Sequence, residues 1–264
     1  MIVNPYSFGI PLDPDTQAFL TASNMTNPTF ITALDSFVIS LKVANLWQKI
    51  RALYPLKGGT ASSNMWNLKD PRDLNAAFRL TYSGGVTYNS HGIIGNGTNA
   101  FANTNLVDSA HLSANNKSIS MYIRNQFHGM NASPMGIVSL ASNFPSNRFS
   151  TDAFTSDYST LGLGQVERPV AGTGLGFFTL SKTQSGQTKY YRPGAPILTQ
   201  TSSNQATENA SYYLLASALA SGGGISFSNA QLALSSVQDG ITDAEEAAYR
   251  AIVETFLTAL GSNV

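Results

Sequence analysis

The stretch from Lys69 to Asn105, KDPRDLNAAFRLTYSGGVTYNSHGIIGNGTNAFANTN, decides the fold class of this chain. It contains two short β-type runs, Phe78–Tyr82 and Val86–Tyr88, which are joined across Ser83-Gly84-Gly85. A segment rich in glycine and asparagine, Gly92–Asn99, follows them. These two residue types adopt positive φ most readily, so they predict tight reversals between strands. Because the preceding sequence has helical patterns and the following sequence has β patterns, the stretch marks the start of a β domain.

The composition excludes several classes of function. The chain has 264 residues, with 15 basic and 15 acidic side chains and no cysteine. A formal net charge of zero argues against nucleic acid and against a membrane surface as partners, and it favours association with other proteins. The absence of cysteine excludes disulfides and thiolate metal sites. The N-terminal residues lack the basic and apolar regions of a signal peptide, so we expect a soluble chain made in the cytoplasm.

The N-terminal quarter is predicted to be helical. Met1–Leu12 is an apolar arm, which either packs on its own domain or clasps a partner. Asp13-Pro14 and Asn27-Pro28 each predict a helix start, because the polar residue can cap the helix and proline suits its first turn. Apolar residues then recur at helical spacing from Phe30 to Leu53, so we expect a helix, or two helices broken near Ala44, that ends before Tyr54-Pro55.

From Phe78 to about Ser235 the sequence predicts short strands separated by turns, the pattern of a sandwich of two antiparallel sheets. Pro193-Gly194 is predicted to close a hairpin, and Ala218–Gly224 is predicted to be a loop. The predicted strands are Phe78–Tyr82, Val86–Tyr88, Ala100–Thr104, Ser118–Arg124, Met135–Leu140, Arg148–Thr151, Gly176–Lys182, Gln187–Tyr191, Tyr212–Ala218 and Gln231–Ser236.

A C-terminal helix over residues 242–260 is the clearest single element. Thr242 and Glu245 form a capping box, an apolar stripe runs from Ile241 to Leu260, and Gly261 ends the helix. We expect the stripe to pack on the sandwich. The chain is thus divided into residues 1–56, an arm with helices for docking, and residues 57–264, a sandwich with its packed helix.

The sequence shows no catalytic signature. No strand carries the pair of carboxylates that a glycosidase needs, and Asp152 and Asp157 lie in a polar stretch without periodicity. The three histidines are scattered at positions 91, 111 and 128, so neither a metal site nor a cofactor is predicted. Gly58-Gly59-Thr60 lacks the context of a phosphate-binding loop. We therefore expect no enzymatic activity.

Carbohydrate binding needs aromatic side chains beside polar groups. The stretch from Phe144 to Tyr158 is polar and aromatic without periodicity, which is typical of an exposed loop. Within it, Phe154, Asp157 and Tyr158 are the candidate glycan-binding residues. Tyr88, Phe101, Phe127, Tyr190 and Tyr191 are further aromatic candidates, which core or turn packing explains better.

Several motifs resemble, in their order, phage and prophage structural proteins with a concanavalin A-like, laminin-G-like jelly-roll domain. They span residues 13 to 260, and Val86 stands where related sequences have tryptophan, which removes a stacking platform there. The matching pieces are Leu46-Trp47 with Lys49, Tyr54-Pro55, Gly58–Ser62, Asn67–Asp73, Ala76–Leu80, Gly84-Gly85, Asn96–Asn99, Ile119–Arg124 and Asp239–Ala247.

The resemblance implies a mainly β chain: a concanavalin A-like jelly-roll β-sandwich with a helical N-terminal lead and a C-terminal helix. It also implies a non-enzymatic virion component, such as a tail, fibre or head-decoration protein. Its expected partners are other virion proteins and further copies of the chain. Two alternatives stay open, a carbohydrate-binding receptor-recognition module for host surface glycans and a glycan depolymerase.

Overall fold

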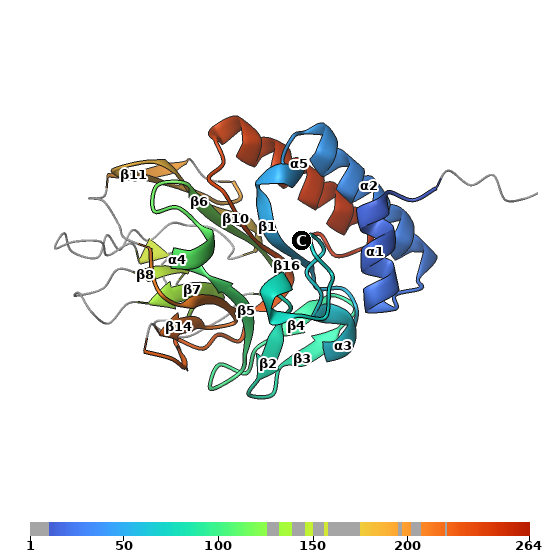
Figure 1. The fold of residues 1–264 in the computed structure, drawn as a ribbon, viewed down its shortest axis with the longest axis horizontal. Coiled ribbons are helices and arrows are strands. Elements are labelled where there is room, and N and C mark those ends of the chain that lie inside the picture. Colours follow the sequence, from blue (N-terminus) through green and yellow to red (C-terminus); the bar gives the residue numbers. More distant parts are fainter. Residues whose placement is uncertain are drawn as a thin grey trace, which may run out of the picture.

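The computed structural model describes residues 11–125, 132–138, 146–149, 156–157, 175–194, 197–201, 207–219 and 221–264. These residues form two β-sheets and a layer of helices against one of them (Figure 1). The chain is thus mainly β with a C-terminal helix, as predicted. Among the described residues, no helix has the length and apolar character needed to cross a bilayer.

Both predicted N-terminal helix starts are confirmed. Helix α1 spans Pro14–Ser23, and Asp13 caps it by accepting from the Asp15 amide. Helix α2 spans Pro28–Val43, and the Asn27 side chain accepts from the Phe30 amide.

The predicted helix through Leu53 is wrong in its last part. The helix ends at Val43, Asn45 has a φ of 55°, and a short 3-10 turn, η1, covers Trp47–Lys49. Ile50–Pro55 then forms strand β1, which pairs with β16 (Gln231–Gln238). Most of β1 is buried on both faces, so its apolar spacing fits a helix stripe equally well. The division into residues 1–56 and 57–264 stays a prediction, although β1 joins the sheet formed by the later residues.

The larger sheet has eight strands, and its described pairs are antiparallel. β1 shares one edge of β16 with β4 (Gly92–Ile94). The turn at Pro193-Gly194 follows β11 (Gln187–Tyr191), which pairs with β12 (Leu198–Thr201) as the predicted hairpin requires. Their order is β12 (Leu198–Thr201), β11 (Gln187–Tyr191), β10 (Gly176–Gln184), β6 (Lys117–Ile123), β16, β4 (Gly92–Ile94) and β3 (Thr87–Asn89).

The smaller sheet has six strands and departs from the predicted antiparallel pattern at one place, since β14 (Ser217–Leu219) and β7 (Met135–Val138) are parallel. The single strand predicted over Tyr212–Ala218 is two strands, because Leu215 between them has a φ of 66°. The order is β15 (Gly224–Ile225), β14 (Ser217–Leu219), β7 (Met135–Val138), β13 (Ser211–Leu214), β5 (Phe101–Val107) and β2 (Thr81–Ser83). β14 and β15 occupy part of the predicted loop Ala218–Gly224. A separate pair joins β8 (Ser146–Phe149) to β9 (Ser156–Asp157).

The glycines that follow β2 make a crossing between the sheets. β2 pairs with β5 in the smaller sheet, whereas β3 pairs with β4 in the larger one. Gly84 lies in the crossing with a φ of 74°, and a Cβ there would lie 1.8 Å from the Asn99 carbonyl oxygen. The two runs that flank Ser83-Gly84-Gly85 therefore do not pair with each other.

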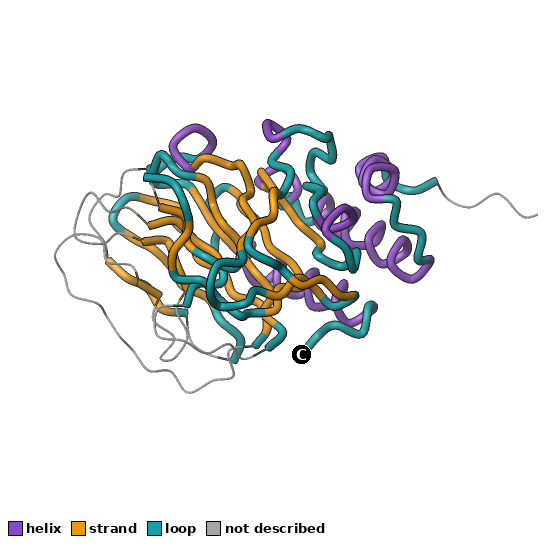
Figure 2. Tube along the Cα trace, turned by 90° about the horizontal axis from the view of Figure 1, so that it is seen from below, coloured by secondary structure: helices purple, strands orange, loops and turns teal. Residues whose placement is uncertain are grey.

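Two core clusters divide the molecule into layers. The first fills the space between the two sheets, with side chains such as Met121 and Leu214, as in a β-sandwich. The second lies between the larger sheet and the long helices near the two ends of the chain, and α1 and α2 lie to the right of the strands in Figure 2. Short helical turns complete the chain at α3 (Ala61–Asn64), η2 (Asn75–Ala77) and α4 (Asp108–His111).

The C-terminal helix α5 spans Asp243–Ala259 and confirms its predicted caps. Thr242 and Glu245 form the capping box. At the other end, the amides of Gly261 and Ser262 donate to the carbonyls of Thr258 and Leu257, the Schellman arrangement that a left-handed glycine permits. Buried residues of α5 such as Val253 and Phe256 belong to the second core cluster, so the apolar stripe is packed.

Candidate functional site

The residues predicted to bind glycan stay untested. Phe154 and Tyr158 lie outside the described residues, as do Asp152, Phe127 and His128. The backbone of Asp157 lies in β9, where it pairs with Arg148, and its side chain is not described.

The two described histidines have structural partners. The Nδ1 atom of His91 lies 3.0 Å from the Ser262 hydroxyl, and that of His111 lies 2.9 Å from the Val107 carbonyl. Within the described ranges, no group of three or more metal-ligating side chains comes together.

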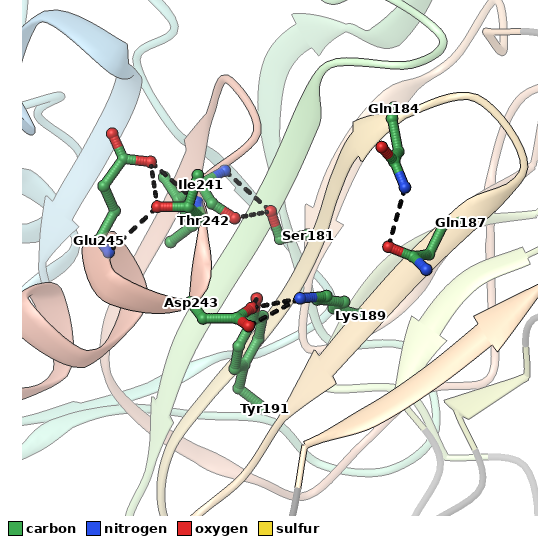
Figure 3. A network of polar contacts seen from close by, with 9 residues as sticks. All are labelled: Ser181, Gln184, Gln187, Lys189, Tyr191, Ile241, Thr242, Asp243 and Glu245. Atoms are coloured by element: carbon green, nitrogen blue, oxygen red, sulfur yellow. Dashed lines mark hydrogen bonds and ion pairs between the residues drawn. The ribbon is translucent and has the colours of Figure 1, made fainter.

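The structure instead brings polar side chains together where the β10–β11 hairpin meets the start of α5 (Figure 3). They line an open pocket of about 330 Å³, which we call the Lys189 pocket. Its lining residues are Ser181, Thr183, Gln184, Gln187, Lys189, Tyr191, Ile241, Thr242, Asp243 and Ala244.

The register of the hairpin explains which side chains face this pocket. Ser181 pairs with Lys189, and Thr179 pairs with Tyr191. Their neighbours Leu180 and Tyr190 belong to the core between the sheets. Since side chains alternate between the faces of a strand, Ser181, Lys189 and Tyr191 lie on the outer face, beside α5.

An ion pair crosses the pocket from the hairpin to the helix. The Lys189 ammonium lies 2.6 and 2.7 Å from the two carboxylate oxygens of Asp243, and the Tyr191 hydroxyl donates to Oδ1 at 2.7 Å (Figure 3). The hydrogen bonds from Lys189 and then Tyr191 hold the pKa of Asp243 below its ordinary value. Because the Asp243 side chain is 50% exposed, the charged pair remains open to a ligand.

Ser181 fixes the start of α5 over the sheet. Its hydroxyl donates to the Ile241 carbonyl at 2.7 Å and accepts from the Ile241 amide at 2.8 Å. Gly240 permits this approach, because a Cβ there would lie 2.1 Å from the Lys182 carbonyl oxygen. The capping box of Thr242 and Glu245 then sets the first turn, so Asp243 points to Lys189.

The hairpin tip adds carboxamides to the rim. Gln184 donates to the Gln187 side chain at 3.0 Å, and both residues line the pocket (Figure 3). Tyr190 and Tyr191 are 5% and 2% exposed, so neither ring offers a stacking surface. The pocket can therefore hold a polar ligand by hydrogen bonds and charge.

Sequence reasoning missed this pocket. From the sequence alone, Asp243 is an acidic residue in the first turn of a helix, where the helix dipole favours negative charge, and Lys189 shows no functional pattern. The alternation in Gln187–Tyr191 was the available signal, since it places Gln187 and Lys189 on one face. Nothing in the sequence indicates that this face meets the start of a helix 52 residues away, where Asp243 contacts Tyr191.

A second hollow has the opposite character. It is a groove of about 680 Å³ between α2 and α5, lined mainly by apolar atoms. Phe37 and Phe256 lie in its lining together with small residues such as Ala33 and Ala251.

Comparison with known proteins gives one structural likeness to report. No protein-family model and no curated protein matches the sequence. Among solved structures, the chain is similar to domain 4 of AbnA, a GH43 extracellular arabinanase from Geobacillus stearothermophilus, in complex with arabinotriose. The TM-score is 0.45 at 14% identity, over 76% of this chain and 98% of that domain.

Proposed function

We propose that this chain is a non-enzymatic carbohydrate-binding protein that holds saccharide in the Lys189 pocket. The observation that carries the proposal is the open ion pair of Lys189 and Asp243 beside the two carboxamides of the hairpin tip. A carboxylate accepts from sugar hydroxyls, an ammonium donates to them, and carboxamides do both. Convergent polar groups of these kinds in a concave site are typical of specific small-ligand recognition.

Two features of the pocket favour binding over hydrolysis. Asp243 is the only carboxylate among the described residues that line it, whereas most glycosidases use two. The lowered pKa of Asp243 also makes it a poor proton donor at neutral pH, because a general acid needs its pKa raised toward the working pH.

A glycan array with four proteins tests the proposal. We expect the wild-type chain to bind a subset of glycans, and Asp243→Asn and Lys189→Gln each to weaken that binding at least tenfold. Asp73→Asn is the matched control, because Asp73 is an exposed carboxylate in another ion pair, with Arg79. Equal binding by all four proteins would place the site elsewhere, and no binding by the wild type would overturn the proposal.

We propose further that the sandwich is a concanavalin A-like jelly roll displayed by a phage particle. The order of the sequence motifs and the zero net charge support this context. In this form of the proposal the partners are other virion proteins and further copies of the chain, a host surface glycan is the ligand, and neither nucleic acid nor membrane is bound. Mass spectrometry of purified particles tests it, and particles that lack the chain would contradict it.

The N-terminal arm is proposed to serve assembly. Deletion of Met1–Leu12 is expected to leave a folded sandwich and to reduce oligomerisation or incorporation into particles, because the arm is apolar and precedes the first helix. Circular dichroism and light scattering measure the two effects. A second variant, with serine at the apolar positions of residues 1–10, keeps the length of the arm and removes only its apolar side chains, so it controls for the shortening of the chain. A deleted chain that assembles normally would contradict the prediction.

A further inference from the structure

The inward face of the β10–β11 hairpin contains a buried charge without a partner. Lys182 is 2% exposed, and its ammonium finds no hydrogen-bond partner among the residues that the structure describes. A buried ammonium that has lost its water needs an opposite charge or good acceptors, since desolvation strongly disfavours the charged form. The position of Lys182 therefore calls for a compensating group.

The neighbouring lysine does not supply that compensation. Lys117 lies directly opposite Lys182 on the adjacent strand β6 and is also buried. Its ammonium lies 2.7 Å from Oδ2 of Asp108. That carboxylate also accepts from the Tyr212 hydroxyl at 2.8 Å and from the Glu208 amide at 2.9 Å. Asp108 thus balances Lys117, and the charge of Lys182 remains unbalanced.

A second unpartnered group lies on the neighbouring strand. Thr188 is 2% exposed, and its hydroxyl also has no partner within the described residues. Leu180 pairs with Tyr190, and both belong to the core between the sheets. Lys182 and Thr188 are each two residues further toward the hairpin tip, so they extend the same inward face. Neither group bonds to the other, although both can donate a hydrogen bond.

We propose that Lys182 and Thr188, with Lys117 beside them, hold a small monovalent anion of halide size at this end of the sandwich. One negative charge balances the group, because Lys117, Lys182 and Asp108 together carry one excess positive charge. The ammonium and the hydroxyl supply the donors that such an ion needs. The site lies on the opposite face of the hairpin from the Lys189 pocket and is independent of the proposed carbohydrate binding.

Without an anion, the same geometry would favour a neutral Lys182. Burial and then the nearby Lys117 lower the pKa of the Lys182 ammonium. A bound anion would oppose both effects and keep Lys182 charged. A site with a charged Lys182 should be stabilised by an anion small enough to enter it, whereas a neutral Lys182 should not respond to the kind of anion in solution. This difference gives a direct test.

The test compares thermal unfolding in sodium chloride and in sodium gluconate at equal ionic strength, because gluconate is too large for a buried halide site. We expect chloride to raise the Tm of the wild type by about 2–4 °C relative to gluconate. Lys182→Met should abolish the difference. Lys189→Met is the matched control, since it removes a partly exposed lysine from the outer face of the same hairpin, and it should keep the chloride effect.

Crystals grown with sodium bromide give a second readout that does not depend on the stability of a variant. We expect an anomalous peak within hydrogen-bonding distance of the Lys182 ammonium and the Thr188 hydroxyl. A Tm that is the same in both salts, together with no anomalous peak, would overturn the proposal and leave Lys182 neutral or hydrated.

Discussion

The two ends of α5 rest on surfaces of opposite chemistry. Its first turn lies over the polar outer face of β10 and β11, where Asp243 meets Lys189 and Tyr191. Its later turns lie against α2, where the Phe256 ring stacks on Phe37 with centroids 4.6 Å apart. Both contacts join α5 to distant parts of the chain. Substitutions within this one helix can therefore compare how much each contact contributes to the free energy of unfolding.

The difference follows from what each contact removes from water. Phe256 is 2% exposed, so its contact gains most of the free energy of burying an aromatic ring. The Asp243 side chain is 50% exposed, and ion pairs at such positions contribute little because water screens them. The apolar end of α5 is therefore expected to stabilise the fold, and the polar end to remain available for binding.

The largest expected effect is at the apolar end. Phe256→Ala should lower the free energy of unfolding by about 3–5 kcal/mol, through lost burial and the cavity left between α2 and α5. Urea unfolding with an unchanged m value measures this loss.

Val43→Ala is the control for that substitution, because Val43 lies on α2 in the same helical layer and is 78% exposed. Its effect should stay within about 0.5 kcal/mol. A loss at Phe256 as small as the one at Val43 would show that this end of α5 awaits a partner and is not part of the core.

The apolar end of α5 could be predicted from the sequence, because local signals determine it. The capping box, the apolar stripe and Gly261 all lie within one segment, and the structure confirms each. The segment Ile50–Leu53 is wrongly predicted as helix, because its apolar spacing fits both a helix and a strand buried on two faces. Only the pairing of β1 with β16 decides between them, and that partner lies far away in the sequence.

An intermediate effect is expected where the helix start is fastened to the sheet. Ser181→Ala removes a buried hydroxyl that both donates to and accepts from the Ile241 backbone. Leaving these backbone groups without a partner should cost about 1–3 kcal/mol. Thr183→Ala, at an exposed position two residues along β10, is the control and should be nearly neutral in the same urea titration. Equal effects would mean that Ser181 does not fasten α5.

The polar end could not be predicted as a site, because each of its polar residues is of a type that is common at its own position in a helix or strand. Asp243 suits the first turn of any helix, and Lys189 suits any partly exposed strand. Their contact depends on the placement of α5 over one hairpin, which Ser181 and Gly240 determine through backbone contacts. Such convergence leaves no periodic signal in the sequence.

The smallest expected effect concerns the pH dependence at the polar end. Asp243→Asn should cost less than about 1 kcal/mol at pH 7, because the pair is half exposed. The hydrogen bonds from Lys189 and Tyr191 lower the pKa of folded Asp243 below its ordinary 3.8. A carboxyl with a lowered pKa stabilises the fold above its unfolded pKa, and this contribution disappears as the pH falls through the folded value. The difference between wild type and variant should therefore vanish in acid.

Glu246, three residues further along α5, provides the opposite case. Burial raises its pKa despite the ion pair with Arg250, so its ionised form is the less favourable one in the fold. When the folded pKa of a carboxyl is raised, the folded state takes up the proton first as the pH drops through that pKa, so acidification stabilises the fold. The wild type should then gain stability relative to Glu246→Gln on acidification, whereas it loses stability relative to Asp243→Asn. Urea midpoints of the three proteins between pH 3 and pH 7 would show the two opposite trends. If both stability differences changed in the same direction with pH, the exposed Asp243–Lys189 pair and the buried Glu246–Arg250 pair would not differ in the way that is expected here.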